Sequence, residues 1–159
     1  MSPAGPAGVP EDVVVLDTDV YSQLYVRQGA TAAAKQVFKD ALVGRSIAIA
    51  VQTRAELLIW PEVRGWSADR AGRLRDQLDK TPTVPVNDLV IEAFVRITVA
   101  CRRTGHALGQ KEHVADRWVA ATAISISRPL LAVDGIYLDA PGLELLRTEP
   151  PATPSPDPD

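Results

Sequence analysis

The sequence contains a single cysteine, Cys101, two histidines, and no uncharged apolar run long enough to cross a membrane. One cysteine excludes an internal disulfide and a cysteine-based metal cage, which fits a reducing compartment. The first dozen residues also lack a basic stretch followed by an apolar one, so we expect no secretory signal. These absences predict a cytoplasmic protein that does not associate with membranes.

A surplus of basic residues is also lacking, because 20 acidic residues outnumber 17 basic ones and give a net charge of -3. Such a balance argues at first against a nucleic-acid partner, since phosphates are bound mainly through Lys and Arg. However, all 17 basic residues lie between positions 13 and 148, together with only 15 of the acidic ones. This segment is therefore net positive by two, and RNA remains a possible ligand.

Proline and glycine are concentrated at the two ends of the chain. Residues 1–12 are rich in Pro, Gly and Ala, and residues 148–159 contain proline at every second or third position. We expect a flexible N-terminal tail over 1–12 and a disordered tail over 148–159. The segment 13–147 is long enough for one hydrophobic core, and we expect a single domain there.

Between the tails, short runs of β-branched residues alternate with longer stretches of helical period. This alternation is typical of an α/β fold in which helices flank a parallel sheet. The predicted strands are 13–16, 46–51, 83–86, 129–133 and 143–146, and the clearest predicted helices are 31–43, 67–80 and 88–103. Residues 105–111 are expected to form a loop.

Two carboxylates come directly after predicted strands. A third carboxylate lies in the first turn of the helix that is predicted after another strand. Asp17 follows the strand at 13–16, Asp134 follows the strand at 129–133, and Glu56 lies in the predicted first turn of the helix after 46–51. Ligands of open parallel sheets gather at the carboxyl ends of strands. Each acid also has a simpler interpretation: Asp17 can cap a helix, Glu56 can complete a capping box with Thr53, and Asp134 can form a turn with Gly135.

A fourth acid, Asp116, lies on a predicted helix in line with Ala120 and Ala123. A stripe of small residues would let this helix press closely on the sheet and bring the carboxylate into a cleft, although a solvent-facing Asp is the alternative. Carboxylates that converge at one edge repel one another unless a cation compensates their charge. All-oxygen ligation favours Mg²⁺ or Mn²⁺ over zinc. The two histidines, His106 and His113, are expected to be a loop residue and a helix-start residue.

Four segments together resemble a PIN domain, in particular a VapC-type toxin of a type II toxin–antitoxin system. They are LDTDVYSQL at 16–24, TRAELL at 53–58, ADRWVAATAI at 115–124 and LLAVDGIYLDAPGLELL at 130–146. The resemblance implies a three-layer α/β/α sandwich with a mainly parallel sheet and a Mg²⁺- or Mn²⁺-dependent endoribonuclease. It implies cleavage of structured RNA such as tRNA or rRNA, inhibition of translation, a VapB-type antitoxin as partner, and a second copy of the chain in a homodimer.

Carried over position by position, the resemblance makes Asp17, Glu56, Asp116 and Asp134 both the catalytic residues and the metal ligands. Asp19 stands where the family commonly has Asn, and it is expected beside the ligands together with Thr53. The sequence also departs from the family at AVDG, which lacks the Thr or Ser often found two residues before the fourth acid.

Two other functions compete with this interpretation. LDTDV at 16–20 fits the first motif of haloacid-dehalogenase-like phosphatases, in which Asp17 would be the nucleophile and Asp19 the general acid. Such enzymes place a hairpin directly after this motif, whereas residues 20–38 are typical of helix. The second alternative is a PIN-like scaffold that binds RNA or protein without cleaving.

Overall fold

The computed structural model describes residues 8–148. A parallel four-stranded sheet lies at its centre, with the strand order β3-β2-β1-β4. The best-paired strands are β1 and β2, where Val13 lies opposite Ser46 and Leu16 opposite Ile49. The bounds are β1 Val13–Leu16, β2 Ser46–Ala50, β3 Thr83–Val84 and β4 Leu130–Leu131.

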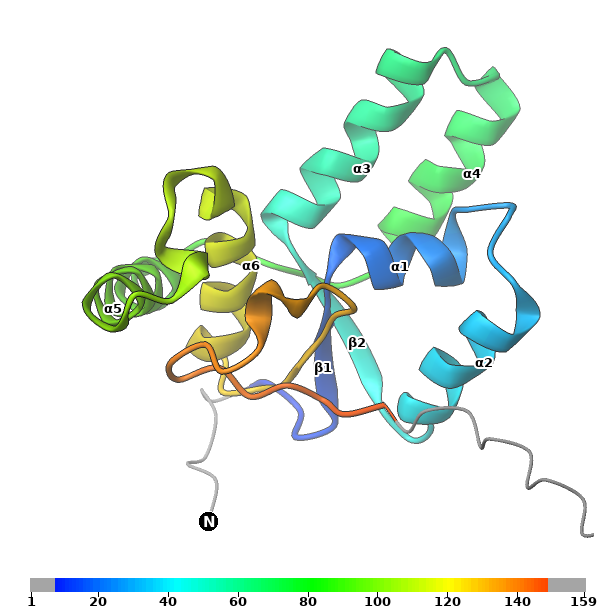
Figure 1. The fold of residues 1–159 in the computed structure, drawn as a ribbon. Coiled ribbons are helices and arrows are strands. Elements are labelled where there is room, and N and C mark those ends of the chain that lie inside the picture. The colour runs from blue at the N-terminus through cyan, green and yellow to red at the C-terminus, as the bar shows by residue number, and fades with distance from the viewer. Residues whose placement is uncertain (1–7, 149–159) are drawn as a thin grey trace, which may run out of the picture.

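Within residues 8–148, six α-helices flank this sheet (Figure 1). Their bounds are α1 Thr18–Tyr25, α2 Ala32–Ala41, α3 Val51–Arg64, α4 Ala68–Asp79, α5 Asp88–Thr104 and α6 Val114–Ser125. Three short 3-10 turns complete the fold, namely η1 Ala107–Gly109, η2 Lys111–His113 and η3 Gly135–Tyr137. The predicted loop at 105–111 thus contains η1 and the start of η2.

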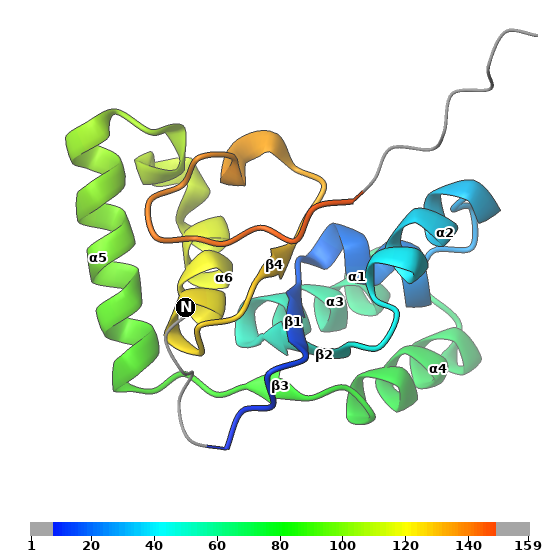
Figure 2. The ribbon, with the colours of Figure 1, turned by 90° about the horizontal axis from the view of Figure 1, so that it is seen from below.

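The alternation of side chains along the strands sorts the helices into two layers. Val13 and Val15 of β1 face a core cluster with residues of α5 and α6, including Ile97 and Ala120. Val14 and Leu16 face a second cluster, to which α1, α2, α3 and α4 contribute Val20, Tyr21, Phe38, Leu57, Leu74 and Leu78. Figures 1 and 2 show α5 and α6 on one side of the strands and the other four helices opposite. The predicted three-layer α/β/α sandwich is confirmed.

The helix ends follow local sequence signals. Thr31, Ser67 and Asn87 each accept a hydrogen bond from a backbone N–H in the first turn of α2, α4 and α5. Gly65 ends α3 and Gly105 ends α5, both in the left-handed conformation that glycine adopts without steric cost. These signals explain why the helices predicted at 31–43, 67–80 and 88–103 are observed within a few residues of their expected ends.

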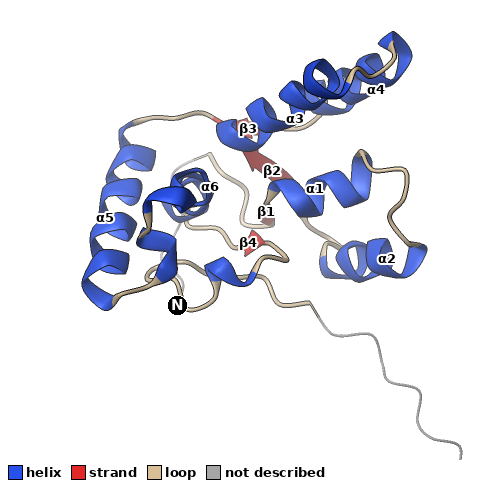
Figure 3. Cartoon of the chain, turned by 45° about the horizontal axis from the view of Figure 1, so that its top comes forward, coloured by secondary structure: helices blue, strands red, loops and turns tan. Residues whose placement is uncertain are grey.

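The outer strands are shorter than predicted (Figure 3). The predicted strands at 83–86 and 129–133 contain only the two-residue strands β3 and β4, and β2 ends at Ala50 because Val51 already belongs to α3. Residues 143–146 form no strand. Leu145 makes an isolated parallel bridge to Leu130, and two backbone hydrogen bonds join Leu130 to Glu144 and Leu146.

The described part of the predicted N-terminal tail is anchored to the domain. The buried Arg128 guanidinium donates to the carbonyls of Val9 and Pro10 at 2.9 and 2.8 Å, and Val9 packs against the core. The rest of the two predicted tails, residues 1–7 and 149–159, lies outside the described residues. No helix within 8–148 is long and apolar enough to cross a membrane.

Candidate metal centre

Asp17 leaves the sheet at the carboxyl end of β1 and precedes α1. Its backbone N–H donates to the carbonyl of Leu131 in β4, and its carbonyl accepts the N–H of Tyr21 in α1. It holds the N-cap position, yet its side chain makes no capping hydrogen bond. The side chain is therefore available for another role, and the capping interpretation does not account for it.

The Asp17 carboxyl group is buried, and this burial raises its pKa from 3.8 to about 6. Hydrogen bonds from the Thr18 backbone and the Tyr137 hydroxyl lower the pKa, whereas the charges of Asp116 and Asp19 raise it further. A buried carboxylate that sits near two other acids is electrostatically suited to a cation.

Asp116 lies in the first turn of α6 and points toward Asp17 from the other layer of the sandwich. Ala120 and Ala123, on the same helix, are fully buried against Val13, Val15, Ala48 and Ala50 of the sheet. The predicted close approach of α6 to the sheet is confirmed. His113, directly before α6, places its Nδ1 at 3.1 Å from Asp116 Oδ2.

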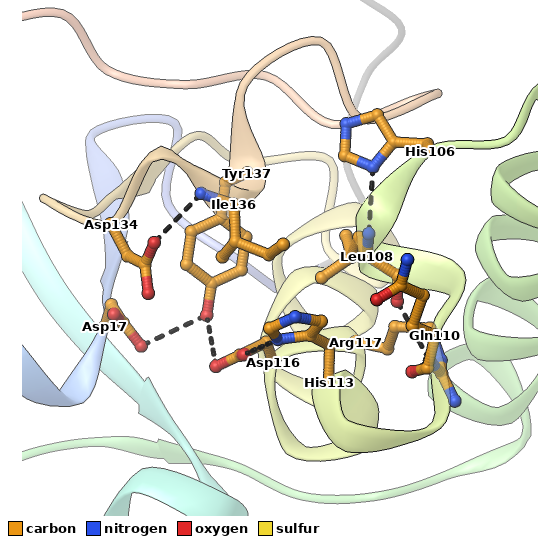
Figure 4. Close-up of polar contacts among 10 residues, drawn as sticks. All are labelled: Asp17, His106, Leu108, Gln110, His113, Asp116, Arg117, Asp134, Ile136 and Tyr137. Carbon is orange, nitrogen blue, oxygen red and sulfur yellow. Dashed lines mark hydrogen bonds and ion pairs between the residues drawn. The ribbon is translucent and has the colours of Figure 1, made fainter.

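Tyr137 joins the two acids, as Figure 4 shows, and was not predicted from the sequence. Its hydroxyl lies 3.3 Å from Asp17 Oδ1 and 3.3 Å from Asp116 Oδ1. The side chain is almost completely buried, and burial together with the two carboxylates raises the pKa of the phenol. Asp17 and Asp116 are therefore brought together at one point, with a neutral hydroxyl between them.

Glu56 is fixed next to this pair through Thr18. The Thr18 hydroxyl lies 2.9 Å from Glu56 Oε2 and 3.2 Å from the Thr53 hydroxyl. The capping-box alternative is wrong, and so is the predicted first-turn position of Glu56, because α3 begins at Val51 and Thr53 is already its third residue. Glu56 consequently lies in the second turn of α3, and its carboxylate is oriented by a hydroxyl of α1 rather than by its own helix.

Asp134 lies near Asp17 and Tyr137 and also holds the turn that follows it (Figure 4). Two residues, Ala132 and Val133, separate it from the end of β4, and its Oδ1 accepts the N–H of Ile136 at 2.9 Å. The turn interpretation of Asp134-Gly135 is thus confirmed. That turn, η3, carries Tyr137 into the core between the other two acids.

Asp19 occupies the edge of this constellation. Its carboxylate pairs with Arg27 at 3.3 Å, and both side chains are about half exposed, at 48% and 50%. The negative charge of Asp19 slightly raises the pKa of the Asp17 carboxyl group. Within residues 8–148, the Asp19 side chain makes no hydrogen bond that caps α1.

The carboxylate pair fits a hard divalent cation. Mg²⁺ is commonly bound by one or two carboxylates and keeps several waters, so Asp17 and Asp116 supply a sufficient oxygen donor set. Over residues 8–148, however, no three His, Cys, Asp or Glu side chains are gathered closely enough to form a complete ligand cage. The four predicted ligands therefore form no preassembled cluster within the described residues, where Asp17 and Asp116 share the Tyr137 hydroxyl as a hydrogen-bond partner.

The comparisons with known proteins agree with this fold. No family model matches the chain, and no curated protein matches its sequence. Among solved structures, a chain of VapBC2 from Rickettsia felis, crystallised with promoter DNA, gives a TM-score of 0.65 at 16% identity, over 84% of this chain and 96% of the other. FitAcB from Neisseria gonorrhoeae gives 0.63 at 19% identity, with the same coverage.

VapBC-5 from Mycobacterium tuberculosis, a member of the VapBC family of toxin–antitoxin systems, is similar as well. Its TM-score is 0.61 at 22% identity, over 86% of this chain and 99% of the other. This chain therefore shares its fold with chains of these VapBC and FitAcB structures. Because the identities are low, the likeness concerns the arrangement of the elements and not the individual residues.

The VapBC-like fold argues against the phosphatase alternative. Residues 18–25 form α1 directly after Asp17, so the hairpin that follows the first motif of such phosphatases is replaced by a helix. Asp19 points to Arg27, whereas a general acid would have to face the same reacting group as Asp17.

Several basic residues of the domain are already engaged in contacts within it and are less available to RNA. Arg117 is buried and donates to the carbonyls of Leu108 and Gln110, and Arg54 donates to Leu78 and pairs with Asp79. The Arg64 guanidinium lies over Trp60 at 4.4 Å, and that of Arg70 lies over Trp66 at 3.6 Å. Arg102 reaches the carbonyl of Gly109 at 3.4 Å. Arg73, Arg103 and Lys111 are exposed at the surface.

Proposed function

We propose that this protein is a Mg²⁺- or Mn²⁺-dependent endoribonuclease that acts as the toxin of a toxin–antitoxin pair. The observation that carries the proposal is the meeting of Asp17 and Asp116 around one buried hydroxyl at the carboxyl ends of the strands. The VapBC-like fold supports it. The RNA would be structured, such as tRNA or rRNA, and its cleavage would inhibit translation.

In this proposal, Asp17 and Asp116 would hold the cation directly, and Glu56 and Asp134 would contact it or its waters. When bound, the cation would lower the pKa of a water molecule and offset charge that develops on the phosphate. Glu56, oriented by Thr18, can accept a proton from the attacking water. Water replaces the 3′ oxygen on phosphorus, which leaves a 5′ phosphate and needs no ribose 2′-OH.

A groove between α1 and α4 supports binding of RNA. It is lined by the aromatic side chains of Tyr25 and Trp66 and by the exposed cations Arg27, Arg73 and Lys80, among others. Exposed cations next to aromatic rings are what sequence-tolerant binding of single-stranded nucleic acid requires, because the cations contact phosphates and the rings stack on bases. We propose that the strand to be cut enters along this groove.

A VapB-type antitoxin and a second copy of this chain are the proposed protein partners. The solved neighbours include VapBC toxin–antitoxin complexes. Two segments that contain apolar residues, 21–26 and 57–60, are candidates for such contacts. Tyr21 and Leu57 are buried, whereas Tyr25 and Ile59 are exposed. Light scattering on the purified chain would test the homodimer, and light scattering after co-expression with the proposed antitoxin would test the complex. A monomeric chain in both samples would contradict these partners.

The metal dependence can be tested by incubating the purified chain with tRNA or rRNA transcripts in Mg²⁺, Mn²⁺ or EDTA. We expect specific cuts with 5′-phosphate ends in either metal and none in EDTA. Cleavage that persists in EDTA would contradict the proposal.

The non-catalytic scaffold is the second candidate, and it makes the opposite prediction for Asp17→Asn. A scaffold would keep its RNA binding and its effect on growth in this variant. A variant that remains folded by circular dichroism but no longer inhibits growth would exclude the scaffold.

A further inference from the structure

Within residues 8–148, the Tyr137 hydroxyl is the only group that hydrogen-bonds to both Asp17 and Asp116. It lies 3.3 Å from Asp17 Oδ1 and 3.3 Å from Asp116 Oδ1. These acids come from different layers of the sandwich, 99 residues apart in sequence. A phenol carries one proton, so it donates to one carboxylate at a time, and the same group serves both.

The ring of Tyr137 is held firmly in the core. Only 1% of the residue is exposed, and it belongs to the cluster that contains Leu108, Ala120 and Leu130. A buried aromatic ring in this setting cannot swing without opening a cavity among its neighbours. The position of the hydroxyl is therefore set by the packing of the core and not by the acids themselves.

The backbone that carries Tyr137 is fixed on both sides. Before it, Asp134 Oδ1 accepts the N–H of Ile136 at 2.9 Å. After it, the carbonyl of Leu138 lies 2.7 Å from Nε2 of His106. His106 Nδ1 accepts the N–H of Leu108, so Nε2 carries the proton and donates to Leu138.

Asp116 is also held at its other oxygen, since His113 Nδ1 lies 3.1 Å from Oδ2. With Tyr137 at Oδ1, both oxygens of this carboxylate have a partner from outside α6. Two neighbouring carboxylates tend to move apart when no cation separates them, because like charges repel. A shared hydrogen-bond donor in a rigid position opposes that movement.

We propose that Tyr137 is a positioning residue for the metal centre: its hydroxyl sets the spacing of the Asp17 and Asp116 carboxylates before a cation binds. This inference rests on the proposed function, because it assumes that these two acids hold the ion. It adds a residue that lies outside the four-acid pattern. If Tyr137 sets this spacing, the free energy needed to bring the two acids together is supplied by folding and does not reduce the affinity for the metal.

The test compares Tyr137→Phe with Tyr21→Phe, a matched control in the opposite core. Tyr21 is also fully buried, and its hydroxyl lies 2.7 Å from that of Thr81. Both variants lose one buried hydroxyl and keep the ring, so both should lose similar stability. Only Tyr137→Phe should bind metal more weakly.

Mn²⁺ binding is measured by calorimetry and by the electron paramagnetic resonance signal of free Mn²⁺, without RNA. We expect the dissociation constant to rise about 10-fold or more in Tyr137→Phe, as for other groups that orient ligands, and to stay within about twofold in Tyr21→Phe. In cleavage assays, Tyr137→Phe should need more Mn²⁺ for half-maximal rate yet approach the wild-type kcat at saturation.

Unchanged or tighter Mn²⁺ binding by Tyr137→Phe would overturn the inference while leaving the nuclease proposal intact. A wild-type chain that binds no Mn²⁺ would overturn both. If Tyr137→Phe does not fold, His106→Ala takes its place, because it loosens the same turn from outside the acid cluster. We then expect a dissociation constant about threefold higher, and an unchanged one would overturn the inference.

Discussion

Asp17 illustrates the conflict between stability and function at the scale of one residue. In the folded chain, burial raises its pKa to about 6, against 3.8 when it is exposed. The native state therefore binds this proton more tightly than the unfolded state, and folding stability falls as pH rises from about 4 to about 6. Above about pH 6, the free energy of unfolding of the metal-free protein is lowered by the full penalty of burying a charged carboxylate.

Asp17→Asn should remove this cost, since the amide is uncharged and its oxygen can still accept a hydrogen bond from Tyr137. In EDTA at pH 7.5, we expect the variant to be more stable than wild type by about 3 kcal/mol, and by about half that at pH 5. Urea denaturation at the two pH values measures this difference. Asp40→Asn, at an exposed position on α2, is the control and should show no such pH dependence. A destabilised Asp17→Asn at pH 7.5 would contradict the assignment.

Asp134 has two tasks that substitutions can separate. Asparagine keeps an oxygen that can accept the Ile136 N–H, whereas alanine does not. Asp134→Ala should therefore lose about 1 kcal/mol of stability, and Asp134→Asn should lose little. If the charge acts on the cation through water, both variants should cleave RNA about 10-fold more slowly. Thermal unfolding and initial rates measure the two effects, and an Asp134→Asn enzyme with full activity would limit Asp134 to the turn.

At the scale of elements, the approach of α6 to the sheet decides where Asp116 lies. The contact depends on the small size of Ala120 and Ala123, because larger side chains would push the helix outward and carry Asp116 away from Asp17.

Ala120→Leu should thus destabilise the fold by about 1–3 kcal/mol and weaken Mn²⁺ binding. The matched control is Ala115→Leu, which adds the same side chain to an exposed position of the same helix and should change neither property. Chemical denaturation and calorimetry test this pair. Equal behaviour of the two variants would show that the packing of α6 does not position Asp116.

The elements that the sequence predicts well are those with strong local signals. Val13–Leu16 is a complete apolar strand that stops at an acid, and α5 has clear signals at both ends in Asn87 and Gly105. The edge strands were overestimated because their length depends on a partner, and β4 meets β1 over only two residues.

The site was predictable only in part for a similar reason. Asp17 and Asp116 stood out because strand ends and small-residue stripes are visible in sequence. Thr53 was predicted beside the ligands, with a capping box as the alternative because T-x-x-E fits one. The strand runs into α3 without a loop, so Thr53 lies inside the helix and cannot cap it. Tyr137 gave no local signal, since its role arises from contacts with residues 21 and 120 positions away.

At the scale of the whole molecule, a net negative chain presents an acidic centre and a groove with exposed cations. The groove between α1 and α4 carries the exposed cations Arg27, Arg73 and Lys80, whereas Asp17 and Asp116 meet beside the carboxyl end of β1. This separation of charge suits a polyanionic substrate and a cation at the point of cleavage. Substrate binding should accordingly weaken as salt is added.

The most direct test of the account is the cleavage rate of one defined RNA in Mn²⁺ by wild type, Asp116→Asn and Asp40→Asn. If Asp17 and Asp116 hold the catalytic cation, Asp116→Asn should remain folded and lose about 100-fold or more in kcat/KM, while Asp40→Asn cleaves like wild type. A folded Asp116→Asn chain that cleaves at the wild-type rate would contradict the account.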